Sequence, residues 1–259
     1  MKQPARKLRK SLKSLPRDLP IAYVHGLRTQ TGRLEAIIAA SVLERKKLAR
    51  QLLKTLKPVR KAAGEVRDMD VLAAKARTLT GRRNDSVARL VEHLVDTRIE
   101  SARALLQTLA KRQKKTRRSL KGFAKQVGQK SSAKSSGARA KPARNWLKDD
   151  AASRLAAELN QWPELNAENL HSFRLKVKEL LYVLHLVRNA DVEFIEALGK
   201  AKEEIGDWHD WHQLAVIAER KLDLQKDRAA LNRIEETGKN KLEKALVAAR
   251  SIKDRVLNA

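Results

Sequence analysis

The most regular pattern of hydrophobic and polar positions lies between residues 170 and 188, a segment without glycine or proline. Its hydrophobic residues recur every three or four positions, which places them on one face of a helix of about five turns. These residues are Leu170, Phe173, Val177, Leu180, Leu181, Leu184 and Val187. The segment is therefore predicted to be a helix that packs this face against a core.

A row of polar side chains borders the hydrophobic face and is displaced from it by one residue. The row consists of His171, Arg174, Lys178, Tyr182 and His185. Cations in such a row repel one another, because two unit charges ~6 Å apart cost about 3 kcal/mol at an effective dielectric constant near 20. The row therefore indicates acidic partners or a bound polyanion, and a basic helix edge whose side chains reach solvent is the alternative.

The rest of the chain also has helical periodicity, and no segment alternates as a strand does, so the predicted fold class is all-α. The first helix is expected from Asp18, as its N-cap, past Val42. Two helices, at 43–57 and 59–79, are expected to be separated by Pro58. The later predicted helices run from Asp85 or Ser86 to Phe123 or beyond, and over about 145–160, 168–188, 192–220 with a break near Gly206, and 224–256.

Two segments hold most of the positive charge. The chain has 259 residues with 57 Lys and Arg against 30 Asp and Glu, a net charge of +27. Residues 1–17 carry seven basic residues and residues 111–148 carry fourteen, neither with an acid, which leaves about +6 elsewhere. Residues 1–17 are predicted to be a mobile basic tail, and residues 127–142, rich in Ser, Gly and Lys, a linker.

Composition excludes several classes of protein. The chain has no cysteine, which rules out disulfides, a thiol nucleophile and cysteine-based metal sites. No hydrophobic run approaches the roughly 20 residues that span a bilayer, and the N-terminus lacks the pattern of a secretory signal. We therefore expect a soluble, cytoplasmic protein with no membrane partner, and the sequence does not indicate its oligomeric state.

Two motifs recur in the same order along the chain. His25-x-x-Arg28-x-x-x-Gly32-Arg33 aligns with His171-x-x-Arg174-x-x-x-Lys178-Glu179, and Gly64-Glu-Val-Arg67-Asp68-Met-Asp70 aligns with Gly206-Asp-Trp-His209-Asp210-Trp-His212. The two offsets, 146 and 142 residues, differ by about one helical turn. The repeat predicts two similar helical bundles, over residues 18–126 and 143–259, related by an approximate two-fold and bringing two basic rows toward one surface.

These motifs resemble the CHAD family of histidine-containing α-helical domains, whose pattern places His-x-x-Arg-x-x-x-Lys/Arg on the first helix of each half. The resemblance covers roughly residues 17–256 and includes the segment Gly-x-x-Arg-Asp-x-Asp-Val at 64–71. It implies two four-helix bundles around a basic groove or cavity that binds inorganic polyphosphate without catalysis, at polyphosphate granules of a bacterial cytoplasm. The sequence departs from the family pattern at Gly32, where a basic residue is usual, and at Leu181, where an Arg is often found.

The candidate binding residues combine three kinds of donor suited to a phosphate chain: the planar fork of Arg, the compact charge of Lys and the titratable ring of His. Asp68 and Asp210 are expected to orient these cations. The candidates are His25, Arg28, Arg33, Arg67, His171, Arg174, Lys178, Tyr182 and His209. No cofactor is predicted.

Parts of the sequence are also compatible with three other functions. Nonspecific nucleic-acid binding is the main alternative, because the basic segments would neutralise any phosphate, although aromatic residues make up only 3% of the chain. A metal site at His209 and His212, with Asp210 or His185, is disfavoured because Arg67 stands at the position that matches His209. A phosphate-processing enzyme is disfavoured, because the sequence has no Gly-rich phosphate loop and no carboxylate cluster common to both halves.

Overall fold

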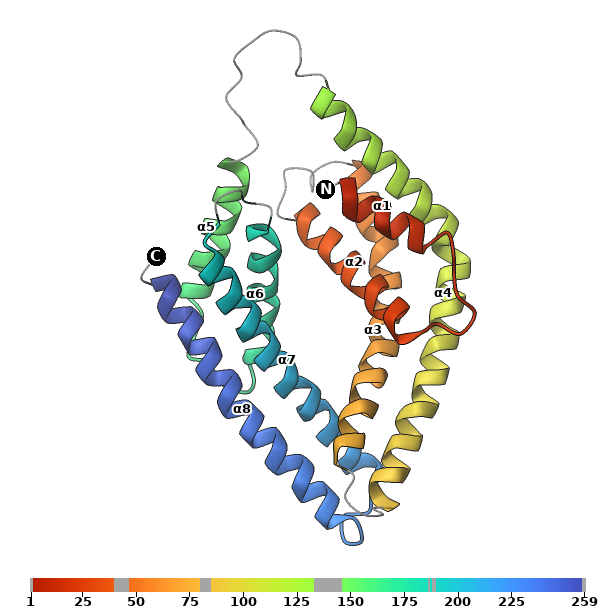
Figure 1. Ribbon diagram of the computed structural model, residues 1–259, viewed down its shortest axis with the longest axis vertical. Helices are drawn as coiled ribbons and strands as arrows, with labels where there is room; N and C mark the ends of the chain where they lie inside the picture. The colour runs from red at the N-terminus through yellow and green to blue at the C-terminus, as the bar shows by residue number, and fades with distance from the viewer. Residues whose placement is uncertain are drawn as a thin grey trace. The chain divides into compact units, whose positions relative to one another are not determined.

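The computed structural model describes residues 2–39, 47–79, 85–132, 146–185, 187 and 190–257. Every regular element in these ranges is an α-helix (Figure 1), so the prediction of an all-α fold is confirmed. The helices are α1 (Lys2–Ser11), α2 (Ile21–Ala39), α3 (Lys47–Thr78), α4 (Asp85–Ser132), α5 (Trp146–Asn160), α6 (Leu170–Leu184), α7 (Val192–Lys221) and α8 (Arg228–Leu257). None of them combines the length and the hydrophobicity that a membrane span requires.

The chain forms two compact units, and α3 and α4 contribute to both. Unit 1 consists of Met1–Asp68 with Thr97–Leu147, and unit 2 of Met69–Asp96 with Lys148–Ala259. In unit 2 the end of α3 and the start of α4 share one hydrophobic cluster with α7 and α8. The two bundles predicted over 18–126 and 143–259 stay a prediction, because the compact units divide the chain differently.

The prediction of a mobile tail at residues 1–17 is wrong, because residues 2–11 form α1 and join the core of unit 1. Ala5, Leu8 and Leu12 lie at helical spacing on one face of this segment, and each is at most 1% exposed. The carbonyl groups at the end of α1 and just after it are also bonded, since Tyr23 Oη donates to Ser11 O and Gln113 Nε2 donates to Leu12 O. Burial of this face outweighs the repulsion among the cations on the other faces.

Two predicted helix breaks are absent. Pro58 lies inside α3, where the missing hydrogen bond and the ring clash cost ~3 kcal/mol or more. Leu56 and Val59 on either side of it are fully buried in the core of unit 1, which keeps the helix continuous. Likewise α7 runs through Gly206 without a break.

The predicted linker at 127–142 falls partly inside α4, which continues to Ser132. Residues 133–145 lie outside the described residues, as does the predicted end of the first helix past Val42.

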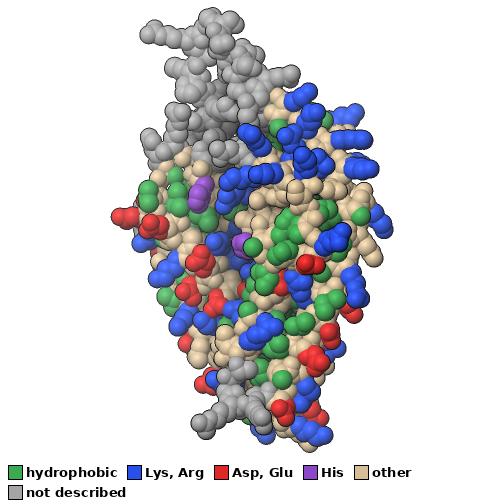
Figure 2. Space-filling model, turned by 45° about the vertical axis from the view of Figure 1, so that its right-hand side comes forward, with side chains coloured by type: hydrophobic (Ala, Val, Ile, Leu, Met, Phe, Trp, Pro, Cys, Tyr) green, Lys and Arg blue, Asp and Glu red, His purple; other side chains and the backbone are tan. Residues whose placement is uncertain are grey.

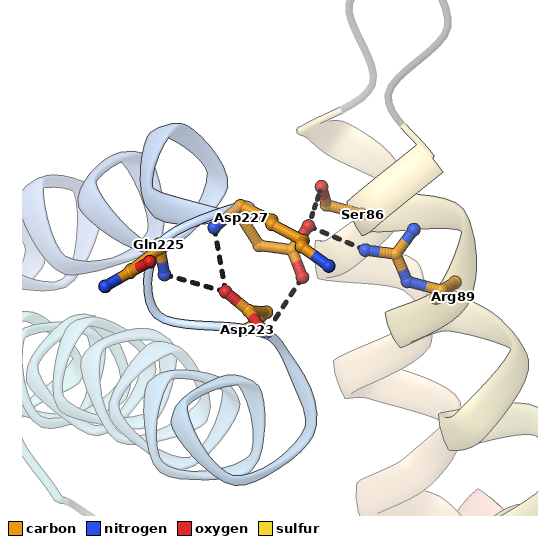
Figure 3. Close-up of polar contacts among 6 residues, drawn as sticks. Ser86, Arg89, Asp223, Gln225 and Asp227 are labelled. Carbon is orange, nitrogen blue, oxygen red and sulfur yellow. Dashed lines mark hydrogen bonds and ion pairs between the residues drawn. The ribbon is translucent and has the colours of Figure 1, made fainter.

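A buried carboxylate, Asp227, joins the segment between α7 and α8 to the start of α4 (Figure 3). Its Oδ1 accepts hydrogen bonds from Ser86 Oγ at 2.5 Å and from Arg89 Nη2 at 2.6 Å, and its Oδ2 accepts one from the Asp223 amide at 2.9 Å. These donors favour the ionised form and lower the pKa of Asp227 to about 2. The α7–α8 connection of unit 2 therefore depends on this carboxylate being charged.

Candidate functional site

The unit 1 row consists of His25, Arg28 and Arg33 on α2 together with Arg67 on α3. Arg28 and Arg67 meet at one carboxylate, Asp68, with Nη2 of Arg28 at 3.9 Å and Nη1 of Arg67 at 3.4 Å from its Oδ1. Asp68 therefore contacts both cations, and the expectation that Asp68 and Asp210 orient the cations of the two rows stays a prediction. His25 and Arg33 are exposed on α2, so this row combines two arginines with a shared acid and two side chains that face solvent.

Arg28 also packs against a glycine of the neighbouring helix. A Cβ atom added to Gly64 would lie 3.5 Å from Arg28 Nε, an ordinary van der Waals distance. The side chain of Arg28 keeps 32% of its surface exposed. Its guanidinium group is therefore positioned by contacts on one side and accessible to a ligand on the other.

The unit 2 row consists of His171, Arg174, Lys178 and Tyr182 on α6 together with His209 on α7. Arg174 is held more tightly than its counterpart in unit 1: its Nε donates a hydrogen bond of 3.0 Å to Lys202 O. A Cβ atom added to Gly206 would lie 2.8 Å from Nη2 and 3.0 Å from Nε of Arg174. Only glycine leaves room at this position for the guanidinium group against the backbone of α7.

Two ring contacts complete the unit 2 row. The imidazole rings of His171 and His209 lie with their centroids 3.9 Å apart at an angle of 34°. Lys178 Nζ lies 5.7 Å from the centroid of the Tyr182 ring, a cation–π arrangement. The structure thus brings together residues of this row that are up to 38 positions apart in the sequence, and all five are partly buried.

The same contact occurs once in each unit. Arg28 and Arg174 are aligned in the first repeated motif, and Gly64 and Gly206 are aligned in the second. In each unit the arginine of the first motif lies against the glycine of the second. This agreement supports the internal repeat, although the convergence of the two rows on one surface stays a prediction.

Sequence reasoning missed an ionic cluster beside the unit 2 row. Asp207 pairs with Lys75 of α3 and, at 2.7 Å, with Lys241 of α8, while Lys75 Nζ lies 5.3 Å from the centroid of the Trp211 ring. Burial alone would raise the pKa of Asp207, but the hydrogen bonds from Lys241 and Lys75 lower it overall. The signal was available in the repeat, because Asp207 aligns with Glu65, so an acid follows the glycine in both motifs.

The alternative metal ligands have other contacts. The His212 ring stacks on Trp208 with centroids 5.8 Å apart, and Nδ1 of His185, the C-cap residue of α6, lies 2.6 Å from Leu181 O. Among the described residues no group of three or more His, Cys, Asp or Glu side chains is arranged to hold a metal ion.

The tryptophans of unit 2 are packing residues. Trp208 and Trp211 are 5% and 6% exposed, and Trp162 packs edge-on against Phe173 with ring centroids 5.6 Å apart. Their rings are therefore occupied by the protein itself and offer little surface for stacking a nucleic-acid base.

Comparison with known proteins identifies one family. The model of the CHAD domain matches residues 3–220. No curated protein matches the chain, and no solved structure matches it.

Proposed function

Because the chain belongs to the CHAD domain family, we propose that it binds inorganic polyphosphate without chemical turnover, through the unit 1 and unit 2 rows. The observation that carries this proposal is the placement of Arg174 on Gly206. A helix interior normally disfavours glycine by about 1 kcal/mol relative to alanine. Here the glycine admits a guanidinium group, and a function that needs this cation in a fixed position explains the residue.

The chemistry of the two rows suits a chain of phosphates. Arginine donates two parallel hydrogen bonds to phosphate oxygens, and Lys178 adds a compact charge four residues after Arg174 on the same helix face. Tyr182 supplies a neutral hydroxyl donor at the end of the row. Such a row can be matched by a ligand that repeats the same anion along its length, which is the chemistry of polyphosphate.

The internal duplication and the cellular location belong to the same proposal. Two copies of one bundle, each with an arginine on a glycine, would supply two sets of contacts to a single polymer and thereby raise its affinity. A protein that binds polyphosphate without turnover is suited to act as a receptor or anchor at polyphosphate granules of a bacterial cytoplasm.

A charge-reversal experiment tests the proposal. The row variant carries Arg28→Glu, Arg174→Glu and Lys178→Glu, which place carboxylates where phosphates would bind. The control variant carries Arg103→Glu, Lys226→Glu and Arg250→Glu, three exposed cations outside both rows with the same total change in charge. Binding of medium-chain polyphosphate and of duplex DNA is measured by titration at physiological salt, after circular dichroism has shown native helicity.

We expect the row variant to lose at least ~100-fold in polyphosphate affinity, which corresponds to about 3 kcal/mol, and the control variant to lose less than ~threefold. Duplex DNA affinity should fall equally in both variants, because nonspecific binding follows total charge. An equal loss of polyphosphate in two well-folded variants would refute the rows as a site and favour a generic nucleic-acid-binding polycation.

A further inference from the structure

A second basic site lies in unit 1 and shares no residue with the unit 1 and unit 2 rows. Helix α1, the residue Lys13 that follows it and helix α4 line a groove of about 610 Å³, and all eight of the described residues that line it are basic. We call it the basic groove, and its residues are Arg6, Arg9, Lys10, Lys13, Lys114, Arg117, Arg118 and Lys121. Figure 2 shows Lys and Arg side chains gathered at the upper right of the face in view, with acidic side chains mostly lower down.

The groove follows from the same spacing on both helices. The four cations that begin at Arg6, three on α1 and Lys13 in the turn after it, occupy positions i, i+3, i+4 and i+7, and the four on α4 occupy the same positions from Lys114. This spacing makes one continuous stripe along a helix. Because the neighbouring faces, including Leu8 of α1 and Leu120 of α4, are buried in one core, the two stripes are held beside each other.

None of the described residues that line the groove is an acid that could balance this charge. Residues 1–17 and 111–148 include no Asp or Glu, so neither helix segment provides a carboxylate from within its own sequence. The Nε atom of Arg117 is buried and has no hydrogen-bond partner in the described structure. A buried donor on a charged side chain is costly to leave unsatisfied, and an anion in the groove would accept its hydrogen bond.

We propose that the basic groove is a second binding site for an inorganic phosphate chain, separate from the unit 1 and unit 2 rows. The ligand class rests on the proposed function, but the site does not use any residue of the rows. A phosphate chain fits this groove better than a nucleic acid does, because none of the described residues that line it is aromatic and bases would lack a ring to stack on. With a site in the groove as well as the rows, one protein could hold two segments of a polymer or two polymers.

Matched triple variants test the groove. The groove variant carries Lys10→Gln, Arg117→Gln and Lys121→Gln. The control variant carries Lys7→Gln, Arg112→Gln and Lys115→Gln, which remove the same residue types from the same two helices outside the groove lining. Both are made in the parent chain and in the row variant, and tripolyphosphate and a single-stranded oligonucleotide of equal charge are titrated by calorimetry.

We expect the parent to bind tripolyphosphate at the groove in addition to the rows, and the row variant to keep the groove site. In the row background the groove variant should lose at least ~tenfold in tripolyphosphate affinity, while the control variant should lose less than ~twofold. An Arg117→Lys variant, which keeps the charge, should lose ~threefold or more, because an ammonium group cannot replace the planar guanidinium fork.

Equal affinities in the groove and control variants would overturn the groove site and leave the proposed function of the rows untouched. Equal binding of the oligonucleotide and tripolyphosphate at the groove would overturn the assigned ligand class. If the rows fail their own test, tripolyphosphate binding that depends on Lys10, Arg117 and Lys121 would still support the groove.

Discussion

Arg28 and Arg174 stand at matching positions of the repeated motif, yet the two units hold them differently. Arg28 has a loose contact with Gly64 and pairs with Asp68 at 3.9 Å, whereas Arg174 lies tightly on Gly206 and donates to Lys202 O. A ligand of Arg28 must compete with a carboxylate. A ligand of Arg174 meets a guanidinium group that a backbone oxygen and the shape of α7 already fix, so less ordering is needed when it binds.

The largest difference should appear when the two glycines are replaced by alanine. In Gly206→Ala the new methyl group would occupy the place of the Arg174 guanidinium group, and polyphosphate affinity should fall ~tenfold, equivalent to about 1.4 kcal/mol. In Gly64→Ala the methyl group makes an ordinary contact, so affinity should change by less than ~twofold. Titration of the parent and both variants with polyphosphate provides the comparison.

The same two alanine variants should also differ in their free energy of unfolding. Alanine improves helix propensity, so Gly64→Ala should raise the free energy of unfolding by up to ~1 kcal/mol. Gly206→Ala should gain less, because Arg174 must move and its bond to Lys202 O is lost. If both variants have the same polyphosphate affinity and the same free energy of unfolding, the different contacts of Arg28 and Arg174 do not affect binding.

The next largest difference should appear at low pH, which should destabilise unit 2 more than unit 1. The described carboxylates with lowered pKa values, Asp207 and Asp227, both belong to unit 2. A carboxylate with a lowered pKa stabilises the folded state above its ordinary pKa, near 3.8, and this contribution is lost as pH falls toward the folded value, about 2 for Asp227. Between pH 5 and pH 2, amide exchange in α7 and α8 should therefore accelerate several-fold relative to α1 and α2.

The ratio of exchange between the units at each pH cancels the intrinsic effect of pH on exchange. Asp227→Asn serves as the control, since it removes the ionisable group and should make this ratio less dependent on pH. If amide protection falls equally in both units as the pH is lowered, neither Asp207 nor Asp227 makes unit 2 more sensitive to low pH than unit 1.

The smallest expected effect is a gain of affinity at unit 1. Asp68→Asn removes the charge that competes with phosphate for Arg28 and Arg67, so polyphosphate should bind ~threefold more tightly. Asn keeps a carbonyl acceptor of similar shape, which limits structural change. A loss of affinity instead would mean that Asp68 is needed to position the two arginines.

The sequence predicted most of this structure where one signal dominated. Helical periodicity placed α6 and α7 to within a few residues, and the repeated motifs indicated the family and paired Arg28 with Arg174. It failed where signals opposed each other. The charge of residues 1–17 predicted a mobile tail, although Ala5, Leu8 and Leu12 pack in the core. Pro58 predicted a helix break, but the burial of Leu56 and Val59 keeps α3 continuous.

The role of Gly206 could not be read from the sequence, because a glycine within a helix is also the signature of a break. Its meaning depends on what lies beside it in space, and only the structure supplies Arg174 as that neighbour. The basic groove was missed for a similar reason. Its two stripes are more than 100 residues apart, and their identical spacing gains significance only when α1 and α4 lie side by side.

The continuity of α3 and α4 has a consequence for dividing the chain. Each helix contributes side chains to two hydrophobic cores, with Leu72 and Leu90 buried in unit 2 although their helices begin or end in unit 1. Cleavage in the 127–142 segment would leave these leucines on the N-terminal fragment without their partners on α7 and α8. The repeat visible in the sequence is therefore not a pair of separable modules, and the fragments would be expected to reassociate or aggregate.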